Sequence, residues 1–203
     1  MGSSAPKMNA GPFRFEPSTL DSKQVQRLHV LSAFYTQERI DTLLVPIITQ
    51  QDELSLRVLD WLVTNYAKKH NVVYEHEQQP GKRLLINVYF EYKAWLRNYR
   101  RKNFDPFRRR ERITFATDGR EEETTVGQLN FVYWAHTYGV LAYTRAHLAT
   151  IEQDMNRSLG EVKRQKEADR REGKKRKRQE LSQLPSARCM VYRAALVTGF
   201  DSD

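Results

Sequence analysis

Cysteine is almost absent from the chain, which contains only Cys189 among its 203 residues. A single thiol cannot form an intrachain disulfide, so we expect a protein of a reducing compartment. Cys189 lies in an apolar, strand-like stretch, where we expect a buried, inert thiol rather than a nucleophile. The histidines are dispersed and lack the spacing of zinc ligands; they are His29, His70, His76, His136 and His147. We therefore expect no bound metal and no other cofactor.

Long hydrophobic runs are also missing. The longest apolar run is LLVPII, at residues 43–48, whereas a membrane-spanning helix needs about 20 residues. The N-terminal stretch MGSSAPKMNAGPFRF has no apolar segment of the kind found in secretory signals. These absences predict a protein that is not secreted and has no membrane partner.

Motifs for catalysis and nucleotide binding are lacking as well. No glycine-rich run ends in Gly-Lys-Ser/Thr, and no G-x-G-x-x-G is present. Three consecutive acids, Glu121 to Glu123, follow the turn at Asp118-Gly119, where adjacent carboxylates are typically solvated. We expect no enzyme activity, no catalytic residue and no small-molecule substrate.

Positive charge is abundant and unevenly distributed. The formal net charge is +9, from 34 basic and 25 acidic residues. Residues 93–112 contain nine basic against two acidic side chains, and residues 163–178 contain ten against three. The rest of the chain therefore has fifteen basic and twenty acidic residues and is net negative. Because charges act mainly within about 10 Å in physiological salt, this segregation is typical of a surface for an anionic partner.

The first basic window surrounds the sequence RRKNFDPFRRRERITF, at residues 100–115. Arginine binds phosphate and guanine in bidentate fashion and stacks on bases. Phe104 and Phe107 are more typical of hydrophobic anchors, although aromatic side chains here could also stack on unpaired bases or insert between base pairs. Binding to nucleic acid is the favoured interpretation, ahead of a protein-facing role and simple solvation. The predicted nucleic-acid-binding residues in this window are Lys93, Arg97, Arg100, Arg101, Lys102, Phe107, Arg108, Arg109, Arg110 and Arg112.

The second basic window contains the run KKRKR, which we add to the predicted nucleic-acid-binding residues. This run is compatible with a nuclear-import signal, and equally with a basic arm that lies along phosphate or against an acidic protein surface. Its members are Lys174, Lys175, Arg176, Lys177 and Arg178.

The expected fold is α+β, a mainly helical single domain with a β-hairpin and a C-terminal strand. Residues 1–20, with their glycines and prolines, are expected to form a flexible arm. A helical core follows at 21–155, with a hairpin at 112–126 around the Asp118-Gly119 turn. Residues 156–184 are highly charged and are expected to be helical only if something supports them; alone they are expected to be disordered or extended. Residues 185–203 are predicted to be a strand that docks on the core.

Five helices are expected within this core. Capping boxes begin helices at Asp21 and Thr125, and Asp52 is a candidate cap for another. The strongest helical periodicity begins at about Leu84 and ends near Asn103, before Pro106. The aromatic and apolar side chains expected to contribute to the core are Trp61, Trp95, Tyr99, Leu129, Phe131 and Trp134.

Four stretches resemble a family of uncharacterised proteins of large nucleocytoplasmic DNA viruses of algae and amoebae. They are LDWLVTNYAKKHNVVY, EYKAWLRNYRRKNFDPFRRRERI, TTVGQLNFVYWA and KRKRQELS, and the similarity extends from about residue 20 to the end. An FDPFRRRERI-type motif is its most specific part. The resemblance implies a viral setting, in a virion or in a virus factory of the host cytoplasm or nucleus, and transfers no catalytic residue.

Two functions follow as hypotheses. The first is a non-enzymatic viral protein that binds nucleic acid, DNA rather than RNA, in genome organisation or late gene expression. The second is a minor capsid or inner virion protein whose basic surfaces bind acidic faces of neighbouring virion proteins. Retention on DNA across a salt series distinguishes the two.

Overall fold

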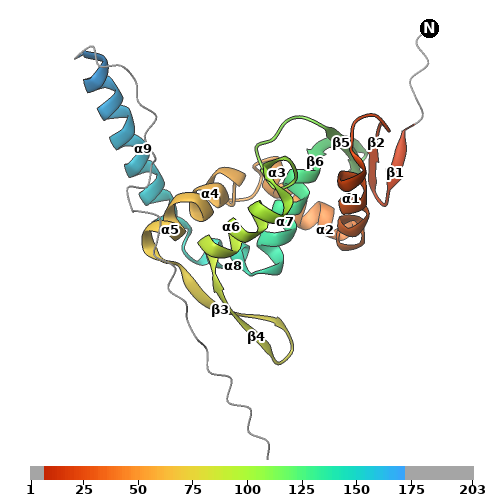
Figure 1. Cartoon of the computed structure of the whole chain (residues 1–203), viewed down its shortest axis with the longest axis horizontal. Helices are drawn as coiled ribbons and strands as arrows, with labels where there is room; N and C mark the ends of the chain where they lie inside the picture. The colour runs from red at the N-terminus through yellow and green to blue at the C-terminus, as the bar shows by residue number, and fades with distance from the viewer. Residues whose placement is uncertain (1–6, 172–203) are drawn as a thin grey trace, which may run out of the picture.

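The structure is a computed structural model that describes residues 7–171. Within this range the chain forms an α+β domain, as the sequence predicted (Figure 1). Three predicted features lie outside the described residues: the basic run at 174–178, Cys189, and the C-terminal strand at 185–203. None of the helices in residues 7–171 combines the length and apolar character needed to cross a membrane.

One sheet has four antiparallel strands in the order β1-β2-β5-β6. The hairpin expected at 112–126 supplies two of them, and Asp118 with Gly119 makes its turn with positive φ angles. Thr125 ends the hairpin and caps the following helix by accepting a hydrogen bond from the Gln128 amide at 3.1 Å. The strands are β1 (Met8–Ala10), β2 (Phe13–Phe15), β5 (Arg112–Thr117) and β6 (Arg120–Thr125).

The prediction that residues 1–20 form a flexible arm is wrong for residues 8–15, which form β1 and β2. The physical reason is the alternation of Phe13 and Phe15, whose side chains are 0% and 2% exposed. Phe13 packs edge-on against Tyr35 and Phe115. Gly11 makes the turn with φ +58°, a backbone conformation that favours glycine.

A second, separate hairpin consists of β3 (Val73–Gln79) and β4 (Lys82–Asn87). It corrects the prediction of a helix from about Leu84, because residues 82–87 are extended. The helix α6 (Val88–Tyr99) begins where Asn87 accepts a hydrogen bond from the Phe90 amide. The apolar residues Leu84 and Ile86 satisfy the period of a strand as well as that of a helix, and pairing with β3 decides between them.

The remaining helices surround a central one, α7, which is buried on nearly all sides. The capping box at Asp21 and Gln24 is present as predicted. Asp52 does not cap a helix, because Ser55 accepts the hydrogen bond from the Val58 amide instead. The helical elements are α1 (Ser22–Phe34), α2 (Gln37–Arg39), η1 (Ile40–Leu44), α3 (Val45–Ile48), α4 (Leu56–Trp61), η2 (Leu62–Tyr66), α5 (Ala67–His70), η3 (Arg101–Asn103), α7 (Val126–Thr137), α8 (Val140–Ala146) and α9 (Leu148–Arg171).

The helix α9 extends well past the predicted core boundary at residue 155. The expectation that the charged segment from 156 is disordered or extended is therefore wrong for residues 156–171. Ile151 and Met155 bury the first turns against the core, and this nucleus allows the helix to propagate through residues of good helix propensity. Figure 1 shows the C-terminal half of α9 projecting away from the rest of the domain.

The core gathers around α7. Trp61, Leu129, Phe131 and Trp134 are buried as predicted, whereas Trp95 and Tyr99 lie partly buried at its edge. Phe104 joins this aromatic cluster, with its ring centroid 5.6 Å from that of Trp134 and 5.7 Å from that of Phe131. The segment that follows α6 is thus fastened to the centre of the domain.

Candidate nucleic-acid interface

The basic loop, residues 100–111, connects α6 to β5 and contains most of the binding residues predicted in the first basic window. Its two ends have unusual backbone conformations. Arg100 has φ 60° and ψ 161°, and Glu111 has φ 55°. Non-glycine residues adopt such angles only when their surroundings impose them, and such strain is concentrated at functional sites. The loop therefore has a fixed shape.

Phe104 is the main anchor of the basic loop. Its side chain is fully buried among the aromatic rings of α6 and α7. Pro106 is buried as well. The loop also lies close to α7 at Gly127, where an added Cβ would be 2.8 Å from the carbonyl oxygen of Asp105. Sequence reasoning expected Phe104 to be an anchor, and the structure confirms this.

A polar connection adds to this anchor. Asn130 of α7 donates a hydrogen bond from Nδ2 to the Asn103 carbonyl oxygen at 2.9 Å. Its Oδ1 accepts hydrogen bonds from Nε and Nη2 of Arg27 at 2.9 and 2.5 Å. The Arg27 guanidinium lies over the rings of Tyr99 and Tyr133, at 4.7 and 5.2 Å from their centroids. Arg27 and Asn130 were missed in the sequence, because 103 residues separate them and neither belongs to a motif.

Three of the nine cations in the first basic window form ion pairs with the chain's own carboxylates. Arg108 donates two hydrogen bonds to Glu111, at 2.9 and 3.0 Å. Lys102 pairs with Asp21 at 2.9 Å and with Glu111 at 3.6 Å. The hydrogen bonds from Arg108, helped by the charge of Lys102, lower the pKa of the Glu111 carboxyl. Arg112 pairs with Glu123. These three cations hold the loop in place.

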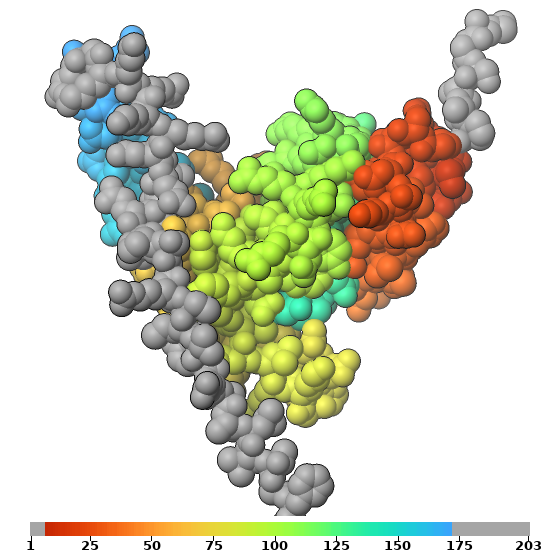
Figure 2. Space-filling view, viewed as in Figure 1, coloured from red at the N-terminus to blue at the C-terminus, as the bar shows by residue number. Residues whose placement is uncertain are grey.

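The other six cations form no ion pair among residues 7–171, and all six are exposed. Lys93 lies over the ring of Tyr89, 5.4 Å from its centroid. In the space-filling view this part of the chain, drawn in green, forms an outward bulge beside the N-terminal strands (Figure 2). The unpaired cations therefore lie on α6 and on the basic loop that directly follows it. They are Lys93, Arg97, Arg100, Arg101, Arg109 and Arg110.

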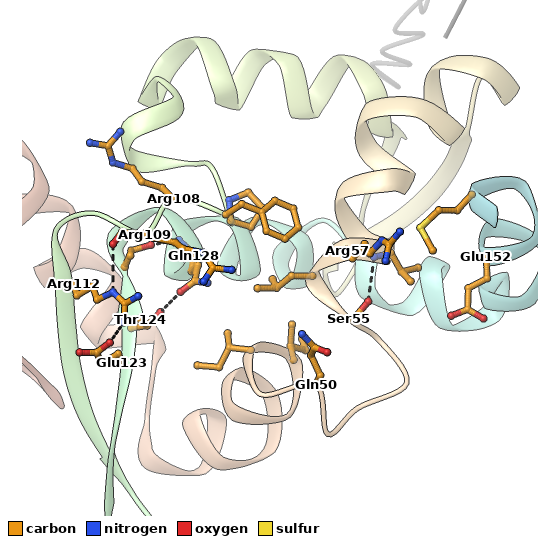
Figure 3. Close-up of a pocket in the computed structure, with 18 residues that line it drawn as sticks. Gln50, Ser55, Arg57, Arg108, Arg109, Arg112, Glu123, Thr124, Gln128 and Glu152 are labelled. Atoms are coloured by element: carbon orange, nitrogen blue, oxygen red, sulfur yellow. Dashed lines mark hydrogen bonds and ion pairs between the residues drawn. The ribbon is translucent and has the colours of Figure 1, made fainter. Parts of the chain in front are cut away.

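A pocket of about 540 Å³ opens beneath the basic loop (Figure 3). Its walls come from α3, α4, the β5–β6 hairpin, the start of α7 and the start of α9. Phe107 lines it and is 46% exposed, so the expectation that Phe107 is a buried anchor is wrong. Arg57 lies on the opposite side of the pocket from Arg109, and Arg108 points away from it (Figure 3). Arg57 and the pocket itself were missed in the sequence, because the lining comes from three stretches that are distant along the chain, at 47–58, 106–128 and 152–155.

The described part of the second basic window lies on α9. Residues 163–171 contain five basic and two acidic side chains. Nearly all of them are exposed, and no ion pair is formed among them within the described chain. The basic members are Lys163, Arg164, Lys166, Arg170 and Arg171.

Comparison with known proteins identifies the family of this chain. Residues 14–191 match a family described as a family of unknown function, DUF7197. The matched range includes the strand β5, the basic loop, the pocket and α9. The chain belongs to DUF7197.

A relative of this DUF7197 protein is the "Uncharacterized protein L507" of Acanthamoeba polyphaga mimivirus, which is 32% identical over 152 residues. The alignment covers 71% of this chain and 58% of the relative, so the chain spans less than two thirds of the relative's length. No solved structure matches the chain. The resemblance to uncharacterised proteins of giant viruses is thereby confirmed, while the FDPFRRRERI-type motif as the family's mark stays a prediction.

One ionisable group at the base of the loop has a displaced pKa. Burial, with the nearby charge of Asp105, raises the pKa of the Asp60 carboxyl to about 6, and Arg101 opposes this rise. Within the described residues no group of three or more His, Cys, Asp or Glu is placed to hold a metal ion. Asp60 is therefore a lone, partly desolvated acid beside the loop.

This displacement predicts a pH-dependent stability. A carboxyl whose pKa is about 6 when folded and 3.8 otherwise disfavours the folded state increasingly as the pH rises from about 4 to 6. Asp60→Asn should therefore raise the free energy of unfolding at pH 7.5, by up to roughly 3 kcal/mol, and leave it nearly unchanged at pH 4. Urea denaturation at both pH values measures the difference. The exposed Asp118→Asn serves as the control, and an equal effect of both substitutions would contradict the prediction.

Proposed function

We propose that this DUF7197 protein is a non-enzymatic nucleic-acid-binding protein of a large DNA virus. The observation that carries the proposal is that the cations of the first basic window fall into two groups, those with an ion pair and those without one. Three form ion pairs that fix a strained loop, and six remain exposed and form no ion pair among the described residues. A cluster of unpaired cations on a rigid loop is suited to bind a polyanion. Because the loop backbone is already fixed, binding loses little conformational entropy of the backbone.

The chemistry of the cluster favours phosphate as the counter-charge. Arginine predominates, and its guanidinium forms paired hydrogen bonds with phosphate oxygens. Contacts of this kind neutralise the backbone and release condensed counterions, which gives affinity without sequence preference. The exposed basic residues of α9 form a second group of cations without an ion pair in the described chain. We propose DNA as the partner, in genome organisation or late gene expression, within a virion or a virus factory.

The test is a pair of double variants that remove equal charge from two places. Arg109→Ala with Arg110→Ala should weaken binding of the full chain to fluorescent duplex DNA about 10- to 50-fold at roughly 0.1 M salt. It should also make the salt dependence shallower by about two units. Fluorescence anisotropy measures both quantities. Both arginines are exposed, so the fold should be unaffected.

The matched control is Lys82→Ala with Arg83→Ala, at the tip of the β3–β4 hairpin, which points away from the basic loop in Figure 1. This control should change the affinity by no more than about 3-fold through net charge alone. Equal losses in the two double variants would contradict a localised interface. Undiminished DNA binding in the loop variant would favour acidic protein neighbours as partners of these arginines.

A further inference from the structure

The pocket beneath the basic loop has the size of a ligand site and is open to solvent at a half-exposed aromatic ring. Its volume of about 540 Å³ lies within the range of small-ligand pockets, roughly 300–1,000 Å³. Most of its exposed lining is polar, and a smaller apolar part comes from Phe107, Pro106 and the buried side chains Ile47, Leu56, Val58 and Met155.

Phe107 is held outward at this pocket by the turn that contains it. The Asp105 carboxylate accepts a hydrogen bond from the Phe107 amide at 2.9 Å, and the buried Pro106 fixes the backbone between them. Among the large apolar side chains of the described residues that are exposed, Phe107 is the one on the basic loop. An aromatic ring kept in solvent by a rigid turn is available for stacking.

The charges around the pocket are arranged on two sides of the apolar floor. Arg57 and Arg109 lie on opposite sides, and neither forms an ion pair within the described chain (Figure 3). Of the two lining glutamates, Glu123 is neutralised by Arg112, whereas Glu152 remains on the α9 side. Gln128 accepts a hydrogen bond from the Thr124 hydroxyl through its Oε1 at 3.1 Å, which leaves its amide NH₂ as a donor.

We propose that this pocket receives one unpaired base of a single-stranded nucleic-acid segment. The base stacks on Phe107 above the apolar floor, and Arg57 and Arg109 bind the phosphates on either side of it. The Gln128 amide donates a hydrogen bond to a carbonyl or ring nitrogen of the base edge. The inference rests on the proposed function and adds to it a preference for unpaired strands.

The arrangement of the cations on either side of the pocket favours a nucleotide over an acidic peptide as its ligand. In a nucleic-acid strand each flat ring stands between two anionic phosphates, which corresponds to a pocket with one exposed aromatic ring and a cation on each side. An acidic side chain instead carries its charge at its tip, which would enter the apolar floor and remain unpaired. Bases within a duplex are stacked and paired, and they reach such a pocket only after unpairing.

The experiment compares oligonucleotides of equal charge by fluorescence anisotropy on the full chain. The probes are a thymidine 12-mer, a 12-mer of abasic residues with the same phosphates, and a blunt duplex. The protein should bind the thymidine strand about 5- to 100-fold more tightly than the abasic strand, because stacking is present only in the first. Phe107→Ala should bind both strands with equal affinity. Arg57→Ala should weaken both by a similar factor.

The matched control is Phe90→Ala, since Phe90 is also exposed, at 42%, but does not line the pocket. This variant should keep the preference for the thymidine strand. Equal binding of thymidine and abasic strands by the unmodified protein overturns the pocket proposal. A preference for the thymidine strand that survives Phe107→Ala also overturns it. Displacement of the thymidine strand by an acidic peptide, and not by the abasic strand, is the third outcome that overturns it. If duplex binding still depends on Arg109 and Arg110 in those cases, the proposed function stands, whereas failure of every oligonucleotide to bind overturns both.

Discussion

Replacing Phe104 by alanine should lower the free energy of unfolding by about 3–5 kcal/mol, one of the two largest effects expected in this domain. Its ring is fully buried and contacts the rings of Tyr92, Trp95, Phe131 and Trp134. Removal leaves a cavity at the centre of the core and releases the basic loop from it. Urea denaturation followed by tryptophan fluorescence measures the loss, because two of the contacting side chains are tryptophans.

Phe107 provides the matched control, three residues along the same loop. Its side chain is 46% exposed, so Phe107→Ala should change stability by no more than about 0.5 kcal/mol. The pair separates the structural role of one phenylalanine from the binding role proposed for the other. Similar losses in the two variants would show that the loop is not anchored as described.

Asp154 is the second position where a large loss is expected. Its carboxylate is 5% exposed and accepts hydrogen bonds from Lys69, Arg157 and the Trp61 indole at 2.5, 3.1 and 3.1 Å. Burial alone would raise its pKa, but the hydrogen bonds from Lys69 and Trp61 bring the pKa below its usual value. Asp154→Ala leaves the cations and the indole unpartnered and should lower the free energy of unfolding by about 3 kcal/mol.

The consequence should be largest for α9, which Asp154 fastens to α4 and α5. Hydrogen exchange of the amides at 157–171 should accelerate more than that of α7. Asp169→Ala is the matched control, because Asp169 lies on the same helix and its carboxylate accepts a hydrogen bond only from Gln165 within residues 7–171. A stability change in the control equal to that of Asp154→Ala would mean that helix propensity, and not the buried carboxylate, fastens α9.

The parts of the fold that the sequence predicted well are those in which nearby residues decide the structure. Asp21 with Gln24 and Thr125 with Gln128 cap their helices through contacts three residues apart. The Asp118-Gly119 turn fixes the β5–β6 hairpin in the same local way. Such signals are contained in a few adjacent side chains, so the sequence alone suffices to detect them.

The parts that the sequence mispredicted depend on distant partners. The strand at Phe13–Phe15 pairs with β5, about a hundred residues away, and its glycine and proline neighbours suggested a flexible arm. The strand at Lys82–Asn87 has a pattern that fits a helix equally well. Likewise α9 continues past residue 155 because its first turns pack on α4, a contact that composition does not reveal.

The candidate site was predicted in part for the same reason. The cluster of cations is local and was visible in residues 93–112. The sequence did not show which of these cations form ion pairs within the chain, because their partners Asp21 and Glu123 belong to other elements. The pocket joins Arg57 to Phe107 across fifty residues of chain, and no spacing rule connects them.

The central claim is that the six unpaired cations of the first basic window meet phosphate groups. The most direct test is the affinity of the unmodified full chain for DNA between about 50 and 300 mM salt. If each of these cations reaches one phosphate, the logarithm of the affinity should fall with the logarithm of salt at a slope of about −5, and more steeply as α9 adds contacts. A slope between 0 and −1 would contradict the claim.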